Sequence, residues 1–189
     1  MLQLPSMNNH SDFDAKEKLA KYAIEYYLKN GKVPDIDKKD LPEDFCHPAA
    51  CFVSIYVDGN LRGCIGDYET CEPLYQNIIK NAINAATLDF RFPPVEISEL
   101  PKLQIEVSVL TKPLEFRPKN PYRLRQFLGK EKPGLLIEKE GKRALFLPQV
   151  WKQIVDPSEF LSHLCLKAGL SSLSWQKPGM KFWTFTVKV

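Results

Sequence analysis

Two short turns, Asp58-Gly59 and Lys139-Glu140-Gly141-Lys142, limit most strongly what this chain can fold into. Runs rich in β-branched and apolar residues lie on both sides of each turn. Two such runs joined by a glycine turn are typical of an antiparallel β-hairpin. The sequence therefore predicts two hairpins, at residues 51–65 and 135–147.

The same order of elements follows both hairpins. After the first, residues 73–88 have the proline start and apolar stripe of an amphipathic helix, and residues 103–110 alternate as a strand does. After the second, residues 156–169 carry helix start and stop signals, and residues 182–189 form a closing strand. The order hairpin, helix, strand occurs twice, which makes an internal duplication a working hypothesis.

Residues 11–31 predict a further helix at the start of the chain. Ser11 and Asp14 match a capping box, and apolar side chains then recur at helical spacing until Gly31 ends the pattern. Residues 32–48 contain three prolines and are expected to form an irregular connection to the first hairpin.

Together these elements predict a single α+β domain, residues 1–189. Two repeated units, residues 50–110 and 134–189, are expected to share one curved, barrel-like, mostly antiparallel sheet with the helices outside. The helix of residues 11–31 precedes both units. Of the 189 residues 44% are hydrophobic, which is enough apolar material for one core of ordinary size.

The charge of the chain argues against a nucleic-acid partner. The 26 basic and 23 acidic residues are interspersed and give a formal net charge of only +3, whereas a polyanion-binding domain carries a clear basic excess. The most basic segment, residues 123–132, does not interleave basic with aromatic side chains as a single-strand groove does. We expect this segment to be a solvated loop.

Leader, membrane and metal signals are weak or missing in the sequence. The first ten residues lack a basic region followed by an apolar stretch, and no window approaches the length of a membrane span. The cysteines are odd in number and lack C-x-x-C spacing, and the Cys46, His47, Cys51 spacing matches no common zinc site. A cytoplasmic protein without membrane contact, metal or cofactor is predicted. The five cysteines are Cys46, Cys51, Cys64, Cys71 and Cys165.

The hexapeptide of residues 61–66 is the most informative short motif. Strand alternation puts Arg62 and Cys64 on one face, where a guanidinium would favour the thiolate, which is the nucleophilic form of cysteine. Gly63 and Gly66 would let a ligand approach the backbone closely. The alternative is that Cys64 is a small buried hydrophobe and that the glycines only form a bulge.

A second candidate, Asp89 with Arg91, directly follows a predicted helix. Pro93 and Pro94 stiffen this segment, and rigid loops position functional side chains well. Arg91 would then bind a ligand, with Asp89 beside it. A purely structural ion pair at the end of the helix explains the same residues.

Two further polar groups stand in otherwise apolar elements. Glu106 and Ser108 lie on the polar face of a strand, where Glu106 would serve as a base, although an exposed sheet face is the simpler explanation. His163 and Lys167 lie one turn apart on the last helix. Lys167 is a candidate anion anchor, or else a surface cation that complements the helix dipole.

The chain resembles the AMMECR family over most of its length. The hallmark of that family, LRGCIG, stands at residues 61–66, and further family motifs follow in order. The resemblance covers residue 50 to the end of the chain with good motif density. The further matching stretches are Asp89 with residues 91–94, then residues 99–101, 106–110, 147–150 and 167–170.

The resemblance implies a fold with two structural repeats that share one barrel-like sheet. It also implies Memo-like and radical SAM proteins as possible partners, because the genes of such proteins often lie together in AmmeMemoRadiSam systems. It assigns no reaction. Phe90 departs from the family pattern, in which proline is usual, and this leaves the turn from Asp89 to Arg91 less rigid.

Two functions are weighed for this chain. The first is an enzyme, or a component of one, that binds a small molecule in a cleft around the hexapeptide, with Cys64 as reactive thiol and Glu106 as base. The second is a non-catalytic protein-binding or adaptor module with a structural cysteine. The predicted substrate-binding residues are Arg62, Gly63, Gly66, Asp89, Arg91 and Lys167.

Overall fold

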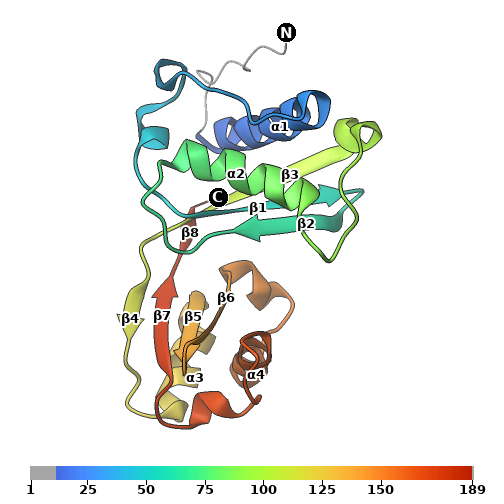
Figure 1. Cartoon of the computed structure of the whole chain (residues 1–189). Coiled ribbons are helices and arrows are strands. Elements are labelled where there is room, and N and C mark those ends of the chain that lie inside the picture. The colour runs from blue at the N-terminus through green and yellow to red at the C-terminus, as the bar shows by residue number, and fades with distance from the viewer. Residues whose placement is uncertain (1–11, 189) are drawn as a thin grey trace. The chain divides into compact units, whose positions relative to one another are not determined.

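The computed structural model describes residues 12–188, and the chain divides into two compact units (Figure 1). Unit 1 comprises residues 1–110 and 188–189, and unit 2 comprises residues 111–187. Each unit has a sheet of four strands and a hydrophobic core of its own.

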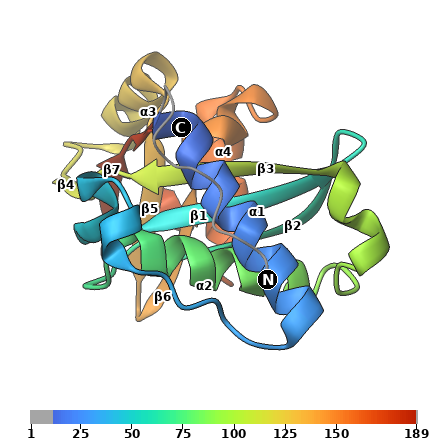
Figure 2. The same ribbon diagram turned by 90° about the horizontal axis from the view of Figure 1, so that it is seen from above.

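Unit 1 places two helices on one face of its sheet. Helix α2 packs over strands β1 and β2, and helix α1 packs beside α2 and against β3, as the view from above shows (Figure 2). The strand order is β2-β1-β3-β8, and β1 pairs antiparallel with both β2 and β3. The elements are α1 (Asp12–Asn30), β1 (Cys51–Val57), β2 (Asn60–Gly66), α2 (Leu74–Thr87), β3 (Leu103–Leu110) and β8 (Val187–Lys188), with 3-10 turns at Lys38–Asp40, Glu43–Cys46 and Ile97–Lys102.

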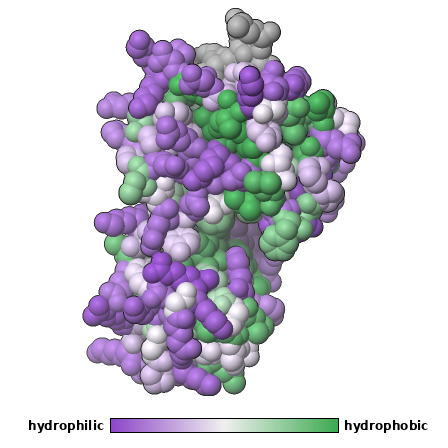
Figure 3. All heavy atoms as spheres, viewed as in Figure 1, coloured by the Kyte–Doolittle hydropathy of each residue, from purple (hydrophilic) through white to green (hydrophobic). Residues whose placement is uncertain are grey.

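Alternation along β1 explains which face of this sheet is the core. Val53 and Ile55 are fully buried against the helices, whereas Ser54 between them points to the other face. The turn of the hairpin uses Asp58 and Gly59 at φ 50° and 79°, the left-handed conformations that a two-residue hairpin turn requires. Figure 3 shows apolar residues grouped over the α1 and α2 part of unit 1, and much of the visible face of unit 2 is hydrophilic.

The hairpin of unit 1 contains a β-bulge at Arg62. Ile55 pairs with Gly63 and Tyr56 pairs with Leu61, so Arg62 is an extra residue in β2. Beyond the bulge, Ser54 faces Cys64. The bulge therefore decides which side chain of β2 meets Ser54.

Unit 2 repeats the order of unit 1 with different additions. Its strand order is β4-β7-β5-β6, and all its described pairings are antiparallel. Helices α3 and α4 pack together, and α4 packs against β6. The elements are β4 (Leu114–Phe116), α3 (Pro121–Glu131), β5 (Gly134–Lys139), β6 (Lys142–Phe146), α4 (Pro157–Lys167) and β7 (Lys181–Phe185), with 3-10 turns at Pro148–Lys152 and Ser174–Gln176.

An aromatic pair organises the core of unit 2. The rings of Trp151 and Phe160 stack with centroids 3.8 Å apart, and Phe146 meets Phe160 edge to face at 5.2 Å. Leu135 and Ile137 of β5 are fully buried beside them. This core is built from β5, β7, α3, α4 and the 3-10 turns, and none of its members comes from unit 1.

The predicted fold class is confirmed, since the chain is α+β with antiparallel sheets, both predicted hairpins and an N-terminal helix. One shared, barrel-like sheet was expected, and two separate sheets are found instead. The physical reason is that each set of three strands is extended by a short strand of its own, β8 beside β3 and β4 beside β7. The prediction that the whole chain is one domain of two repeats, residues 50–110 and 134–189, stays a prediction.

Two local expectations were wrong. The basic segment of residues 123–132 is not a loop but lies almost wholly in helix α3, which buries Leu124 and Leu128 while its charged side chains face solvent. The closing strand is two short strands, β7 and β8, separated at Thr186. Ser11 of the predicted capping box lies outside the described residues. In the part of the chain that is described, no helix is both long and apolar enough to cross a bilayer.

Candidate functional site

Three polar side chains form one row across the sheet of unit 1. Ser54 on the central strand pairs with Cys64 on one side and with Glu106 on the other. The Ser54 hydroxyl donates a hydrogen bond to the Cys64 sulfur, with Oγ and Sγ 3.2 Å apart. Ser54 is buried, and Cys64 and Glu106 are half-buried. The face of the sheet opposite the helices therefore carries a thiol, a hydroxyl and a carboxylate side by side on neighbouring strands.

The neighbouring row adds a second hydroxyl. Ser108 pairs with Phe52 across the strands, and its hydroxyl donates to Oε1 of Glu106 over 3.4 Å. Ser108 is buried, with 2% of its surface exposed. Glu106 thus has a hydrogen-bonding neighbour on its own strand.

Asp89 links strand β2, which carries Cys64, to the end of helix α2. Its carboxylate, 4% exposed, accepts hydrogen bonds from the Cys64 backbone N–H at 2.8 Å and from Nε and Nη2 of Arg91 at 2.9 and 2.6 Å. The hydrogen bonds from Arg91 are the main reason that the pKa of Asp89 falls to about 2, and the Cys64 N–H contributes in the same direction. Asp89 is therefore a charged carboxylate that is fully engaged by its neighbours.

Arg91 is the guanidinium that reaches Cys64. Its Nη2 donates to the Cys64 carbonyl at 3.2 Å, and 46% of the side chain is exposed. The hydrogen bonds with Asp89 raise the pKa of Arg91, and the negative charge of a Cys64 thiolate adds to that shift. Within residues 12–188, Nη1 of Arg91 makes no hydrogen bond, so it is available to an anionic ligand.

Arg62 was predicted to be the cation beside the thiol, but its guanidinium binds the carboxylate of Glu99 instead. Nε and Nη2 bind both oxygens of Glu99 at 2.9 and 3.0 Å, and the remaining donors bind the carbonyls of Pro93 and Pro94. The bulge at Arg62 breaks the alternation from which the prediction was made. Arg62 ties β2 to the segment between α2 and β3, and its role in binding a substrate stays a prediction.

The two glycines of the hexapeptide have packing reasons of their own. A Cβ at Gly63 would lie 2.1 Å from the Ala85 carbonyl oxygen, so helix α2 packs directly on the strand backbone. A Cβ at Gly66 would lie 2.3 Å from the Phe52 ring. Packing alone requires both glycines, and their role in binding a substrate stays a prediction.

Comparison with known proteins shows the family of this chain. The AMMECR1 family model matches residues 17–189. The chain belongs to the AMMECR1 family. This confirms the resemblance predicted from the hexapeptide and the motifs that follow it.

Archaeal proteins are among the relatives in the AMMECR1 family. A protein of Methanothermobacter thermautotrophicus is 39% identical over 178 residues, covering 91% of this chain and 90% of the relative. A protein of Methanopyrus kandleri is 38% identical, covering 91% and 84%. The crystal structure of an uncharacterized Pyrococcus horikoshii protein is similar with a TM-score of 0.83 and 37% identity, covering 91% of this chain and 87% of that one. The printed names of these relatives assign no reaction.

The remaining predicted residue of this AMMECR1 domain, Lys167, belongs to unit 2. Its Nζ donates to the Leu145 carbonyl at 3.0 Å and lies 5.2 Å from the centre of the Phe146 ring. His163, one turn earlier, lies 3.7 Å from Glu159. Lys167 as an anion anchor stays a prediction.

Sequence reasoning missed Ser54 and Tyr56. Burial raises the pKa of the Tyr56 hydroxyl, the negative charge of Glu106 raises it further, and a hydrogen bond with Ser54 opposes both. Tyr56 is therefore an electrostatic neighbour of the row. The signal was present, because strict alternation along residues 51–57 puts both side chains on the non-core face.

No metal centre emerges from the described residues of this AMMECR1 domain. Among residues 12–188, no three His, Cys, Asp or Glu side chains group closely enough to hold a metal ion. The chemistry that the site offers is that of a thiol with hydroxyl, carboxylate and guanidinium neighbours.

Proposed function

We propose that this chain is an enzyme, or a component of one, that acts on a small anionic substrate through the Cys64 thiol. The observation that carries the proposal is the hydrogen bond from Ser54 to the Cys64 sulfur in a polar row that ends in Glu106. A hydroxyl that donates to sulfur favours the thiolate, and the thiolate is the nucleophile.

The neighbouring charges support separate roles in this proposal. Arg91 carries its positive charge beside Cys64 and keeps exposed donor capacity for a carboxylate or phosphate. Asp89 is a positioning residue, because it holds both the Cys64 backbone and the Arg91 side chain. Glu106, on the strand beyond Ser54, is the proposed base; the thiol proton passes to it through the Ser54 hydroxyl, which accepts from Cys64 and donates to Glu106 in that step.

The test is the alkylation rate of each cysteine in the native protein, followed by peptide mass spectrometry between pH 6 and 9. Cys64 is expected to be alkylated faster than the exposed Cys71 at pH 7. Cys51 and Cys165 serve as slow controls because both are buried, and burial raises the pKa of Cys51 to about 12 and also raises that of Cys165. Protection of Cys64 until the protein unfolds would overturn the proposal.

A pair of arginine variants separates electrostatic activation from simple exposure. Arg91→Gln removes the guanidinium that contacts Cys64 and is expected to slow its alkylation about threefold or more. The matched control Arg62→Lys removes the bidentate contact with Glu99 and is expected to lower stability without changing that rate. Equal rates in the wild type and Arg91→Gln would remove Arg91 from the mechanism.

A second candidate function, a protein-binding module, has one observation in its favour. Phe90 and Leu88 flank buried Asp89 and are 96% and 69% exposed. Exposed apolar groups on a firmly held turn suit a docking surface, and Memo-like and radical SAM proteins are the proposed partners. Capture of such a partner that survives Cys64→Ser but is lost in Phe90→Ser would favour this function.

We also propose the cytosol as the location of this protein. All five cysteines are free thiols in the structure, and proteins of reducing compartments rarely form disulfides. Fractionation of the host cell tests this, and recovery outside the cytosol would contradict it.

A further inference from the structure

Unit 2 contains a pocket that is separate from the row around Cys64. It has a volume of about 490 Å³ and is formed by residues 115–121 on one side and residues 175–182 on the other, with Leu124 of helix α3 between them. All of its lining residues belong to unit 2. The volume lies within the range of about 300–1,000 Å³ typical of pockets for small molecules.

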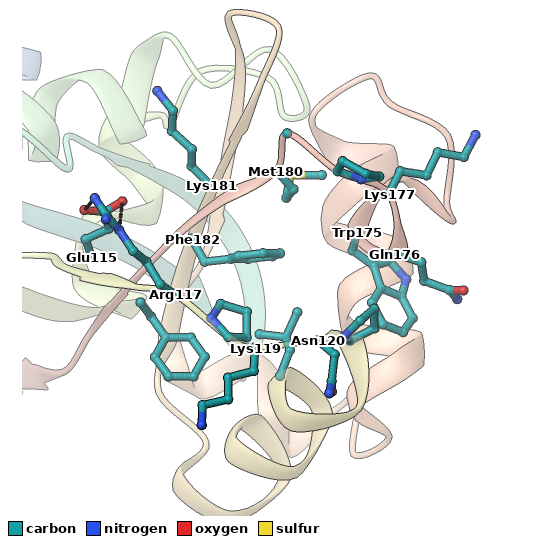
Figure 4. Close-up of a pocket in the computed structure, with 16 residues that line it drawn as sticks. Glu115, Arg117, Lys119, Asn120, Trp175, Gln176, Lys177, Met180, Lys181 and Phe182 are labelled. Atoms are coloured by element: carbon teal, nitrogen blue, oxygen red, sulfur yellow. Dashed lines mark hydrogen bonds and ion pairs between the residues drawn. The ribbon is translucent and has the colours of Figure 1, made fainter.

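Apolar and aromatic side chains form one part of the lining of this pocket. Figure 4 shows the side chains of Phe182, Met180 and Trp175 around its centre. Phe182 and Trp175 are each 5% exposed, so their positions are fixed by the core of unit 2. Phe116, which also lines the pocket, stacks on Phe127 with ring centroids 4.2 Å apart. A flat apolar group would find matching surfaces here.

The rim of the pocket is basic. Four cationic side chains line it against one carboxylate, Glu115, which is paired with Arg117 at 2.8 Å. Lys181 reaches Glu138 at 3.4 Å. Lys119 and Lys177 are exposed, and within the described residues neither forms an ion pair.

The unpaired lysines give the rim its preference for anions. In Figure 4 the side chains of Lys119 and Lys177 extend away from the centre of the pocket. A lysine stem has several rotatable bonds, so its ammonium group can turn toward a bound charge. The positive excess at the rim arises within a chain whose net charge is only +3, so it is a local feature of this site.

We propose that this pocket binds a small amphiphilic anion, with a flat aromatic body against Phe182, Met180 and Trp175 and an anionic group held by Lys119 and Lys177. The apolar side chains contact the flat body, and the lysines select for charge. The anionic group is a carboxylate, sulfonate or phosphate, all of which lysine binds as a point charge. This site is independent of the thiol chemistry proposed for unit 1.

The experiment compares two probes of the same shape, 2-naphthoate and the neutral 2-naphthylmethanol, titrated into the whole protein. Binding is followed by the indole N–H signal of Trp175 in ¹⁵N-labelled protein, with Trp151 as an internal control because it lies in the core and does not line the pocket. Naphthoate is expected to bind about tenfold more tightly than the alcohol at low salt, and the difference is expected to shrink as salt rises.

Lysine variants test whether Lys119 and Lys177 cause the preference for the anionic probe. The double variant Lys119→Ala with Lys177→Ala is expected to remove the advantage of naphthoate while leaving the affinity for the alcohol within about twofold. Lys130→Ala is the matched control, since Lys130 is an exposed lysine of α3 that does not line the pocket. All three side chains are on the surface, so these variants are expected to fold.

Inorganic phosphate and benzoate, added as competitors, identify the anionic group. Displacement of naphthoate by either one supports the proposal and names the preferred class. Equal affinities for naphthoate and the alcohol would overturn it, because the pocket would then be only an apolar surface. No shift of the Trp175 signal at millimolar probe would overturn it as well.

Discussion

The same row of the sheet is polar in unit 1 and apolar in unit 2. Ser54 and Leu136 each stand four positions before the glycine turn dipeptide of their hairpin, on the face away from the core. Ser54 pairs with Cys64 and Glu106, whereas Leu136 pairs with Leu145 and Trp183. The strand orders β2-β1-β3 and β6-β5-β7 otherwise match.

This difference shows that the fold does not require polar residues in this row. Unit 2 shows that the arrangement of three strands and a helix forms with Leu136 and Leu145 in the row, both more than 90% buried. A thiol, a hydroxyl and a carboxylate at the same place are therefore no requirement of the architecture. That is the strongest argument for a function of the row in unit 1.

The largest effect is expected where the two units differ in helix packing. Gly63 pairs with Ile55, and its counterpart in unit 2 is Ala144, which pairs with Ile137. Gly63→Ala puts a Cβ 2.1 Å from the Ala85 carbonyl oxygen and should cost about 3 kcal/mol in the free energy of unfolding. Urea denaturation measures this. The reverse change Ala144→Gly should cost only about 1 kcal/mol, and equal costs would mean that the two helices pack alike.

The second-largest effect on stability is expected just after the helix of each unit, α2 in unit 1 and α4 in unit 2. Two residues after α2 stands Asp89, and two residues after α4 stands Gly169 at φ 69°. The folded pKa of Asp89, about 2, lies below its ordinary value of 3.8, so its contribution to stability is present above pH 4 and is lost as the pH falls toward 2. Asp89→Asn should cost about 2 kcal/mol at pH 7 and about half of that at pH 3. A loss that does not vary with pH would contradict the electrostatic explanation.

The third effect should be equal in the two units. Gly59 and Gly141 occupy the same turn position at φ 79° and 75°, and a Cβ at either would contact nothing within 4 Å. Gly59→Ala and Gly141→Ala should each cost about 1 kcal/mol, from backbone strain alone. Thermal unfolding of both variants checks this. If the two costs differed by more than about 1 kcal/mol, the two hairpin turns would also differ in their contribution to stability.

The smallest effect on stability is expected for Ser54→Ala. The serine hydroxyl donates to a weak acceptor, the Cys64 sulfur, so the free energy of unfolding should change by less than about 1 kcal/mol. Alkylation of Cys64 should nevertheless slow about threefold, because the donor that favours the thiolate is gone. Ser108→Ala is the control, since that hydroxyl donates to Glu106. A large loss of stability without a change in rate would make the row structural.

Most of the fold was predictable from local pattern. Both glycine turns, the alternation of residues 103–110 and the proline start of α2 correspond to elements with the expected bounds. Helix α3 was missed although Asn120 as N-cap, Pro121 in the first turn and the spacing of Leu124 with Leu128 were all visible. The charges of the exposed face outweighed these signals.

The candidate site was harder to predict because a one-residue irregularity decides its geometry. Without the bulge at Arg62, counting back from the Asp58-Gly59 turn pairs Ser54 with Gly63 and leaves Cys64 one position further along. Regular alternation also puts the guanidinium of Arg62 beside the thiol, whereas the structure puts it on Glu99. Long-range contacts such as that of Asp89 with the Cys64 N–H leave no trace in local periodicity.

The place of residue 188 has a consequence for the order in which the chain is completed during synthesis. Unit 2 enters at Thr111 and leaves at Thr186, which are joined by a backbone hydrogen bond of 2.9 Å, so residues 111–187 form a closed insertion within unit 1. The fourth strand of unit 1 includes Lys188 and leaves the ribosome only after every residue of unit 2. Unit 2, though encoded later, can therefore finish folding first, and unit 1 exposes the free edge of β3 until then.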